Sequence, residues 1–165
     1  MGAGKSTIGR MLAKELACPF YDSDHVIEDR SGADIPWIFD VEGELGFRDR
    51  ESQVIEEICC QKGVVMATGG GVVSRPENRR HLSTNGFVVY LNTPVSIQLR
   101  RTEKDKRRPL LQRPDRKEVL AKLLQERDPL YRSIADLVLD TATMSPRQII
   151  KKIVQTVGTV GLEKQ

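Results

Sequence analysis

Two periods of apolar residues run through this chain. Ile8, Leu12 and Leu16 recur at the spacing of one helix face, which predicts a helix over 5–17. Short apolar runs bounded by turn residues predict buried strands at 19–21, 64–67, 87–91 and 137–139. Because strands alternate with helices along the chain, we expect a mostly parallel sheet covered by helices on both faces.

The other predicted helices lie between and after these strands. They cover about 25–30, a short stretch around Trp37, a long stretch after Gly46 that closes at 62–63, a stretch opened by Pro76, then 94–102, 117–127 and 146–157. The stretch 103–116 is polar, basic and interrupted by proline, so we expect a long loop there. The tail 158–165 has no core pattern and is expected to fray.

Composition narrows the class of protein. The 165 residues suffice for one packed core, so we expect a single domain over 1–165. Hydrophobic residues make up 39% and charged residues 30%, as in ordinary soluble proteins. The net charge of +3 is too small to indicate nucleic acid, although it suits anionic substrates. Only 5% of residues are aromatic, which disfavours a stacking platform for single-stranded nucleic acid.

Cysteine usage and the length of apolar runs indicate the compartment. The cysteines, Cys18, Cys59 and Cys60, are odd in number and lack a C-x-x-C spacing, which disfavours disulfides and zinc. The chain has no signal-peptide pattern and no apolar run long enough to span a bilayer. We therefore expect a cytoplasmic protein without a membrane partner.

The residues Gly2-Ala3-Gly4-Lys5-Ser6-Thr7 match the end of the phosphate-binding pattern G-x-x-x-x-G-K-[ST]. Glycines let backbone N–H groups point at phosphate oxygens, and the helix that follows directs its positive end to the same place. The pattern assigns Lys5 to the β- and γ-phosphates and the Ser6 hydroxyl to Mg²⁺. A glycine-rich tail would look similar, but here the motif opens an amphipathic helix, which favours the phosphate site.

Asp22-Ser23-Asp24 follows the first predicted strand. In open α/β sheets, ligands bind at the carboxyl ends of the strands. Two carboxylates at this spacing suit a division of labour, with one near Mg²⁺ and the other facing an acceptor hydroxyl. Ser23 or Asp24 would equally serve as a helix cap, so the motif takes its functional meaning from the phosphate-binding motif upstream.

Arg48 and Glu51 are three residues apart and share a helix face. A guanidinium there suits bidentate binding of a substrate carboxylate, with Glu51 orienting the arginine. The commoner meaning of this spacing is a surface ion pair that contributes less than about 1 kcal/mol. The spacing alone leaves both meanings open.

Three successive glycines, Gly69, Gly70 and Gly71, follow the strand over 64–67. Such a run raises the conformational entropy lost on folding. It indicates either a flexible turn or a backbone on which a ligand packs so closely that a Cβ has no room. The position at the end of a strand favours the ligand.

The basic stretch from Arg100 to Leu111 is the last candidate. Its interleaved acidic residues and its lack of aromatic residues disfavour a nucleic-acid surface, while a solvated charged loop stays open. We favour a lid over about 103–116, from which Arg108 reaches the transferring phosphate. Farther along, Arg127 offers a second guanidinium for a substrate.

Taken in order, these motifs resemble the shikimate kinase family. The resemblance rests on Gly2–Thr7, Asp22-Ser23-Asp24, Phe47-Arg48, Gly69-Gly70-Gly71, Arg108-Pro109-Leu110-Leu111, and Arg127 followed by Pro129-Leu130-Tyr131. Each motif is moderately specific, but the ordered set is highly specific and spans nearly the whole chain. It implies a P-loop, NMP-kinase-like α/β fold with three α/β/α layers, a parallel central sheet, a lid and a substrate-binding helical region at about 23–60.

The resemblance also implies a reaction and its residues. The reaction is ATP-dependent phosphorylation of the shikimate 3-hydroxyl on the chorismate route to aromatic amino acids, with Mg²⁺ as the metal and shikimate and ATP as the partners of a monomer. The implied ATP site comprises Gly2, Ala3, Gly4, Lys5, Ser6, Thr7, Arg101, Arg108 and Met144. The implied shikimate site comprises Asp24, Arg48, Gly69, Gly70, Gly71 and Arg127. Ser6 and Asp22 are implied at Mg²⁺, and Lys5, Asp24 and Arg108 are implied in catalysis.

The chain departs from the family at its start. Family members have a strand and a glycine ahead of the position of Met1, and that strand is central to the sheet. We therefore expect this first strand to be missing from the sheet, and we hypothesise a truncated or misplaced start.

Two rival functions remain open on the sequence. One is another small-metabolite kinase of the same fold, such as a gluconate kinase, because arginines suited to a carboxylate serve either substrate. The other is a non-catalytic nucleotide- or partner-binding module. The expected loss of a strand favours the module. Arguing against it is the intact set Lys5, Ser6, Asp22, Asp24 and Arg108.

Overall fold

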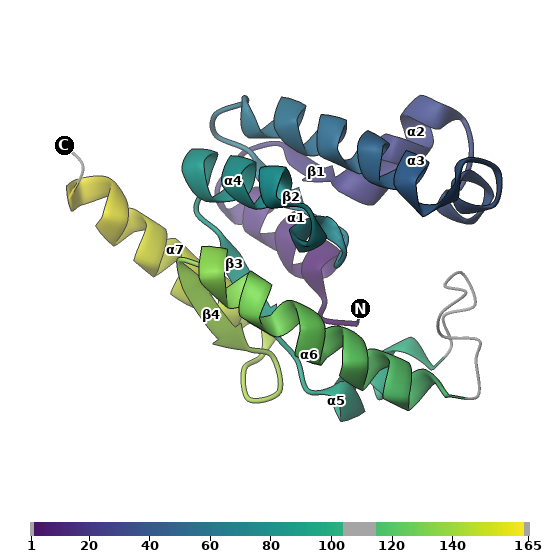
Figure 1. The fold of residues 1–165 in the computed structure, drawn as a ribbon. Helices are drawn as coiled ribbons and strands as arrows, with labels where there is room; N and C mark the ends of the chain where they lie inside the picture. The colour runs from purple at the N-terminus through teal and green to yellow at the C-terminus, as the bar shows by residue number, and fades with distance from the viewer. Residues whose placement is uncertain (1, 104–114, 164–165) are drawn as a thin grey trace.

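A computed structural model describes residues 2–103 and 115–163 of the chain (Figure 1). The strands are β1 (Phe20–Asp22), β2 (Val65–Ala67), β3 (Val89–Asn92) and β4 (Leu137–Asp140). The helices are α1 (Lys5–Glu15), α2 (Ser23–Ser31), α3 (Ile35–Cys59), α4 (Pro76–Asn85), α5 (Val95–Thr102), α6 (Arg116–Ile134) and α7 (Pro146–Glu163), with a 3₁₀ turn η1 (Val72–Ser74). The predicted lid around Arg108 lies mainly outside the described residues.

The strands pair in parallel, as the sequence predicts, but they form two separate sheets. In one sheet β1 pairs with β2, with Phe20 opposite Val65. In the other β3 pairs with β4, with Val89 opposite Leu137. Within the described residues β2 and β3 do not pair with each other, and a cavity of about 410 Å³ lies between them. The predicted parallel arrangement is therefore present as two halves.

Helices cover both faces of the strands (Figure 1). On one face α1 and α7 pack against β3 and β4, through a cluster that includes Ile8, Leu91 and Ile149. On the other face α3, η1 and α6 share a second cluster around Ile55 and Val73. A third cluster joins α2 and α3 to the edge of β1 and β2. The arrangement has the three layers of the predicted α/β/α fold.

The prediction of a helix that ends at Arg127 is wrong. Helix α6 continues through Pro129 to Ile134. A proline inside a helix removes one backbone hydrogen bond. The partial burial of Leu130, Tyr131 and Ile134 against the cluster around Ile55 offsets that loss. Helix α7 runs to Glu163, past its predicted end at residue 157.

The two helices predicted around Trp37 and after Gly46 form one element with a break inside it. Helix α3 begins after Asp34, whose side chain accepts a hydrogen bond from the Trp37 N–H at 2.9 Å. Its one residue with non-helical angles is Gly43, at φ 71°. This φ favours glycine, so the chain bends there and the second part of α3 carries Arg48 and Glu51 toward the strands.

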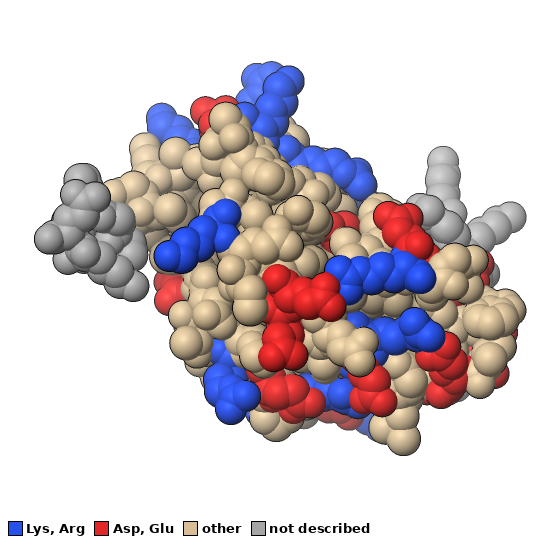
Figure 2. Space-filling model, turned by 90° about the horizontal axis from the view of Figure 1, so that it is seen from above, with Lys and Arg blue, Asp and Glu red and all other residues tan. Residues whose placement is uncertain are grey.

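The surface near α3 mixes both signs of charge. Figure 2 views the molecule from the α3 side and shows acidic and basic side chains next to one another. Ion pairs join Arg50 to Glu42 at 2.7 Å, Arg75 to Asp49 at 2.6 Å, and Arg30 to Glu57 at 2.6 Å. Among the described helices, none is long and apolar enough to cross a membrane.

Candidate active site

The phosphate-binding motif turns directly into α1. Gly2 and Gly4 have φ values of 68° and 84°, which side chains with a Cβ rarely adopt. Gly4 is the N-cap of α1, and no side chain caps that helix end. The first N–H groups of a helix have no partner within the helix and carry the positive end of its dipole. This geometry suits an anion such as a phosphate.

Ser6 and Asp22 place two oxygen atoms beside this helix end. The Ser6 hydroxyl donates a hydrogen bond to Asp22 Oδ2 at 2.6 Å, and Asp22 Oδ1 accepts from the Asp24 N–H at 3.2 Å. Asp22 is thus the cap of α2, and the alternative in which Ser23 or Asp24 caps that helix is not what the structure has. A hydroxyl and a carboxylate beside a phosphate cradle are the oxygen ligands that Mg²⁺ prefers, so these residues fit that metal. The described residues contain no group of three or more His, Cys, Asp and Glu arranged for another metal.

Asp24 and Glu51 meet at the first glycine of the turn that follows β2. A Cβ built on Gly69 would lie 2.8 Å from Asp24 Oδ1 and 3.1 Å from Glu51 Oε1. The Gly69 N–H donates to the fully buried Ser23 hydroxyl at 3.3 Å, which ties the turn to the start of α2. Glycine at this position therefore leaves room for two carboxyl groups.

The Arg48–Glu51 pair is buried. Arg48 Nη1 donates to Glu51 Oε2 at 2.6 Å, and the side chains are 13% and 1% exposed. The Arg48 guanidinium also lies over the Phe47 ring, 5.1 Å from its centroid. Burial raises the pKa of Glu51 above its ordinary value, and the Arg48 charge opposes that rise. The pair is therefore not the exposed surface bridge that the spacing alone left open.

The other two glycines face arginines. A Cβ on Gly71 would overlap the guanidinium of Arg48. A Cβ on Gly70 would lie 3.8 Å from Arg127 Nη1 and 3.3 Å from the Tyr131 hydroxyl. The structure thus gathers the predicted substrate residues around one turn, from α2, α3 and α6. These are Asp24, Arg48, Gly69, Gly70, Gly71 and Arg127.

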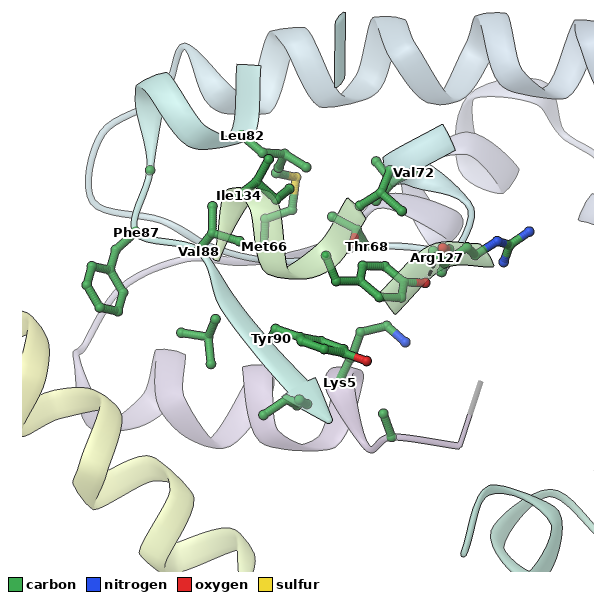
Figure 3. Close-up of a pocket in the computed structure, with 18 of the residues that line it drawn as sticks. Lys5, Met66, Thr68, Val72, Leu82, Phe87, Val88, Tyr90, Arg127 and Ile134 are labelled. Atoms are coloured by element: carbon green, nitrogen blue, oxygen red, sulfur yellow. Dashed lines mark hydrogen bonds between the residues drawn. The ribbon is translucent and has the colours of Figure 1, made fainter. Parts of the chain in front are cut away.

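Lys5 faces the same region across the cavity between the sheets (Figure 3). Its lining includes Lys5, Thr68, Gly70 and Arg127, together with apolar side chains from β2, β3, α4 and α6. Figure 3 shows the Lys5 side chain beside β3. Asp24 and Arg48 do not line this cavity but reach the glycine turn at Gly69 and Gly71.

A second cavity, of about 260 Å³, brings together other residues predicted at ATP. Ala3, Gly4, Thr7, Arg101 and Met144 are among its lining residues. Arg101 donates to the Gly2 carbonyl at 3.2 Å and to the Thr141 carbonyl at 3.1 Å. It therefore holds the phosphate-binding turn against the end of β4. Arg108 lies outside the described residues, so its contact with ATP stays a prediction.

Tyr131 belongs to the motif that follows Arg127, but the sequence assigned it no role in the site. Its hydroxyl donates to the Gly70 carbonyl. The available signal was its position four residues after Arg127, which places both side chains on one face of a helix. That signal was hidden because the helix was expected to end before Pro129.

Comparison with known proteins gives one family. A family model described as shikimate kinase matches residues 1–158. The shikimate kinase of Pseudomonas syringae pv. syringae is 58% identical over 153 residues, covering 93% of this chain and 89% of that protein. The shikimate kinase of Hahella chejuensis is 55% identical over 156 residues, covering 94% of this chain and 81% of that protein.

Solved structures agree with this comparison. Shikimate kinase from Acinetobacter baumannii, in complex with shikimate, superposes with a TM-score of 0.92 at 50% identity, covering 96% of this chain and 89% of that one. Shikimate kinase from Aquifex aeolicus has a TM-score of 0.83 at 34% identity, covering 98% of this chain and 94% of that one. The two half-sheets and their helices therefore have the fold of these enzymes.

Proposed function

Because the chain belongs to the shikimate kinase family, we propose that it transfers the γ-phosphate of ATP to the 3-hydroxyl of shikimate. The products are shikimate 3-phosphate and ADP, on the chorismate route to aromatic amino acids. The observation that carries the proposal is the convergence of Asp24, Arg48 and Arg127 on one glycine turn beside the Lys5 cavity. This arrangement suits a small molecule with a carboxylate and hydroxyl groups.

The two arginines bind the carboxylate of shikimate. Arg48 comes from α3, and its guanidinium would overlap a Cβ on Gly71; Arg127 comes from α6, and its Nη1 would lie 3.8 Å from a Cβ on Gly70. Planar guanidinium groups match a carboxylate in a fork-like geometry. The buried Glu51 keeps the Arg48 side chain in one orientation, so less side-chain entropy is lost on binding. The helical region at 23–60 supplies Asp24 and Arg48 to this substrate site.

Asp24 faces the acceptor hydroxyl. It is the second residue of α2, two positions after the cap residue Asp22, and its Oδ1 would lie 2.8 Å from a Cβ on Gly69. A carboxylate there orients the hydroxyl and takes its proton as the new bond to phosphorus forms. The enzyme's part in phosphoryl transfer is mainly to align the two oxygens and to neutralise charge.

Lys5 and the start of α1 hold the phosphates of ATP. The turn at Gly2–Gly4 and the helix end it precedes provide backbone N–H groups, and Lys5 adds a positive charge. Arg101 and Met144 border the cavity proposed for the nucleotide base. Ser6 and Asp22 would hold Mg²⁺, which when bound neutralises phosphate charge. We further propose that the enzyme acts as a cytoplasmic monomer.

The proposal is tested by measuring ADP release from ATP and Mg²⁺ with shikimate, with gluconate, and with no acceptor. Shikimate-dependent ADP release, with a phosphorylated shikimate identified by mass, is the expected result. Release that depends on gluconate instead would identify the rival kinase. ATP binding without transfer to either acceptor, by a folded protein, would favour the binding module.

A further inference from the structure

The middle of the glycine turn is tethered to α6 by a phenol. The Tyr131 hydroxyl donates to the carbonyl oxygen of Gly70. The two residues are 61 positions apart in the sequence, so this bond joins two distant segments. A Cβ on Gly70 would also lie 3.8 Å from Nη1 of Arg127, which precedes Tyr131 by one helical turn.

Tyr131 is itself held in place by Tyr90 on β3. The two rings lie with their centroids 4.8 Å apart and their planes inclined by 30°. The Tyr90 hydroxyl donates to Asp128 Oδ1 at 2.9 Å, and Arg132 donates to Asp128 Oδ2 at 2.7 Å. Tyr90 thus anchors α6 at Asp128, the residue next to Arg127, while its ring supports that of Tyr131.

The bond to Gly70 fixes more than one atom. A peptide group is planar, so its C=O and the next N–H point to opposite sides. Holding the Gly70 carbonyl toward Tyr131 directs the Gly71 N–H away from Tyr131. Gly71 is the residue whose missing Cβ leaves space for the Arg48 guanidinium. The orientation of the Gly70–Gly71 peptide plane therefore determines the backbone position of the turn next to Arg48.

The hydroxyl remains a donor at neutral pH. Burial raises the pKa of Tyr131, and the nearby Arg127 guanidinium only partly opposes this. A protonated phenol beside a carbonyl oxygen donates its one hydrogen to it.

We propose that Tyr131 is a positioning residue for shikimate, which orients the Gly70–Gly71 peptide group and aligns Arg127 with Arg48. This proposal rests on the proposed function, because it assigns Tyr131 to the shikimate side of the site and not to the ATP side. Tyr131 acts through the glycine turn, and its role is separate from proton or phosphate transfer.

The test compares Tyr131→Phe with Tyr90→Phe. Each variant removes one hydroxyl from the same pair of stacked rings, but only the first removes the bond to Gly70. For Tyr131→Phe we expect the KM for shikimate to rise about fivefold, as the loss of one hydrogen bond predicts, with the KM for ATP unchanged. For Tyr90→Phe, which keeps the ring and loses only the bond to Asp128, we expect a smaller rise in the KM for shikimate than in Tyr131→Phe. An unchanged KM for shikimate in Tyr131→Phe, or equal rises in both variants, would overturn the proposal.

A second measurement does not depend on catalysis. Amide hydrogen exchange over 69–71 in the folded protein reports the order of the turn. We expect faster exchange at Gly71 in Tyr131→Phe and wild-type exchange in Tyr90→Phe. If the wild-type protein leaves shikimate unphosphorylated, the proposed function fails, but hydrogen exchange still tests whether the Tyr131–Gly70 hydrogen bond orders the turn. Wild-type exchange at Gly71 in Tyr131→Phe would show that the Tyr131–Gly70 hydrogen bond does not order the turn.

Discussion

The guanidinium of Arg48 is bound to the carboxylate of Glu51 at 2.6 Å, and Glu51 is fully buried. Breaking a buried pair by removing one partner costs about 3 kcal/mol because the other charge loses its compensation. We expect Arg48→Met to lower the free energy of unfolding by that amount. It should also raise the KM for shikimate roughly 100-fold, as for the loss of a buried charge pair.

Arg30→Met is the matched control for this prediction. Arg30 pairs with Glu57 at the same distance of 2.6 Å, but the two side chains are 48% and 55% exposed. An exposed pair contributes less than about 1 kcal/mol, so stability and the KM for shikimate should hardly change. Chemical denaturation and steady-state kinetics measure both quantities. Equal effects of the two substitutions would contradict the assignment of Arg48.

The pH dependence of shikimate binding should carry the signature of Glu51. Burial raises the pKa of Glu51, so its carboxylate takes up a proton at a higher pH than an exposed glutamate does. Protonation removes the charge that orients Arg48. We therefore expect the KM for shikimate to rise as the pH falls through a window above 4.5, the ordinary value.

The effect of Glu51 on the free energy of unfolding depends on pH in the opposite direction. A carboxyl whose pKa is raised by folding favours the folded state most below its ordinary pKa, and this contribution is lost as the pH rises through the raised value. In Glu51→Gln both dependences on pH should weaken. Profiles of KM and of unfolding free energy that match the wild type would show that Glu51 does not titrate there.

Gly71→Ala should disrupt the substrate site by steric overlap alone, without backbone strain. Gly71 has φ −83°, which alanine adopts without strain, but the added Cβ would overlap the Arg48 guanidinium. We expect a roughly 100-fold loss of kcat/KM for shikimate, the size of effect produced by a misplaced binding group. Gly158→Ala is the control, because nothing lies within 4 Å of its added Cβ. That change should leave kcat/KM intact and raise stability by up to about 1 kcal/mol.

Asp22→Asn should weaken the response to Mg²⁺. The amide oxygen of asparagine still accepts from the Asp24 N–H and caps α2, while the negative charge beside Ser6 is lost. We expect the half-saturating Mg²⁺ concentration to rise about tenfold, with activity recovered at high Mg²⁺. Asp34→Asn is the control, since Asp34 caps α3 in the same way. An unchanged Mg²⁺ titration in Asp22→Asn would remove Asp22 from the metal site.

The cavity between β2 and β3 predicts that the fold accepts one more strand. Successive residues of a strand direct their backbone groups to alternate edges. The backbone N–H of Val65 donates to the Pro19 carbonyl beside β1. The backbone groups of Met66, the next residue, therefore point to the opposite edge of β2, toward the cavity. An apolar segment of about five valine and isoleucine residues with a final glycine, fused ahead of Met1, should bury its side chains there. It should raise the melting temperature by about 10 °C.

A fusion of the same length with lysine at alternate positions is the control. Its charges oppose burial on the apolar walls, so its melting temperature should stay at that of the original chain. Calorimetry measures the shift, and hydrogen exchange at Met66 and Leu91 locates the added strand. An equal rise in melting temperature for both fusions would show that the added segment does not stabilise the fold by filling the cavity.

Local patterns predicted most of the elements. The four apolar runs became strands whose observed ends lie close to the predicted ones, because short buried strands have few alternatives. The phosphate-binding turn was also predictable, since positive φ at Gly2 and Gly4 is a demand that glycine alone meets easily. The continuation of α6 through Pro129 was not predictable, because it depends on what Tyr131 and Ile134 pack against.

The sequence by itself determined the class of chemistry. The order of Lys5, Asp24, Arg48 and Arg127 among their motifs is a property of the chain, and it identified a kinase of small anionic alcohols. Only the tertiary structure decided which of these groups act together. Burial distinguishes the Arg48–Glu51 pair from the more exposed Arg50–Glu42 pair of the same helix. The hydrogen bond to Gly70 makes Tyr131 part of the site. Burial and contact between distant segments arise from packing, which local spacing does not encode.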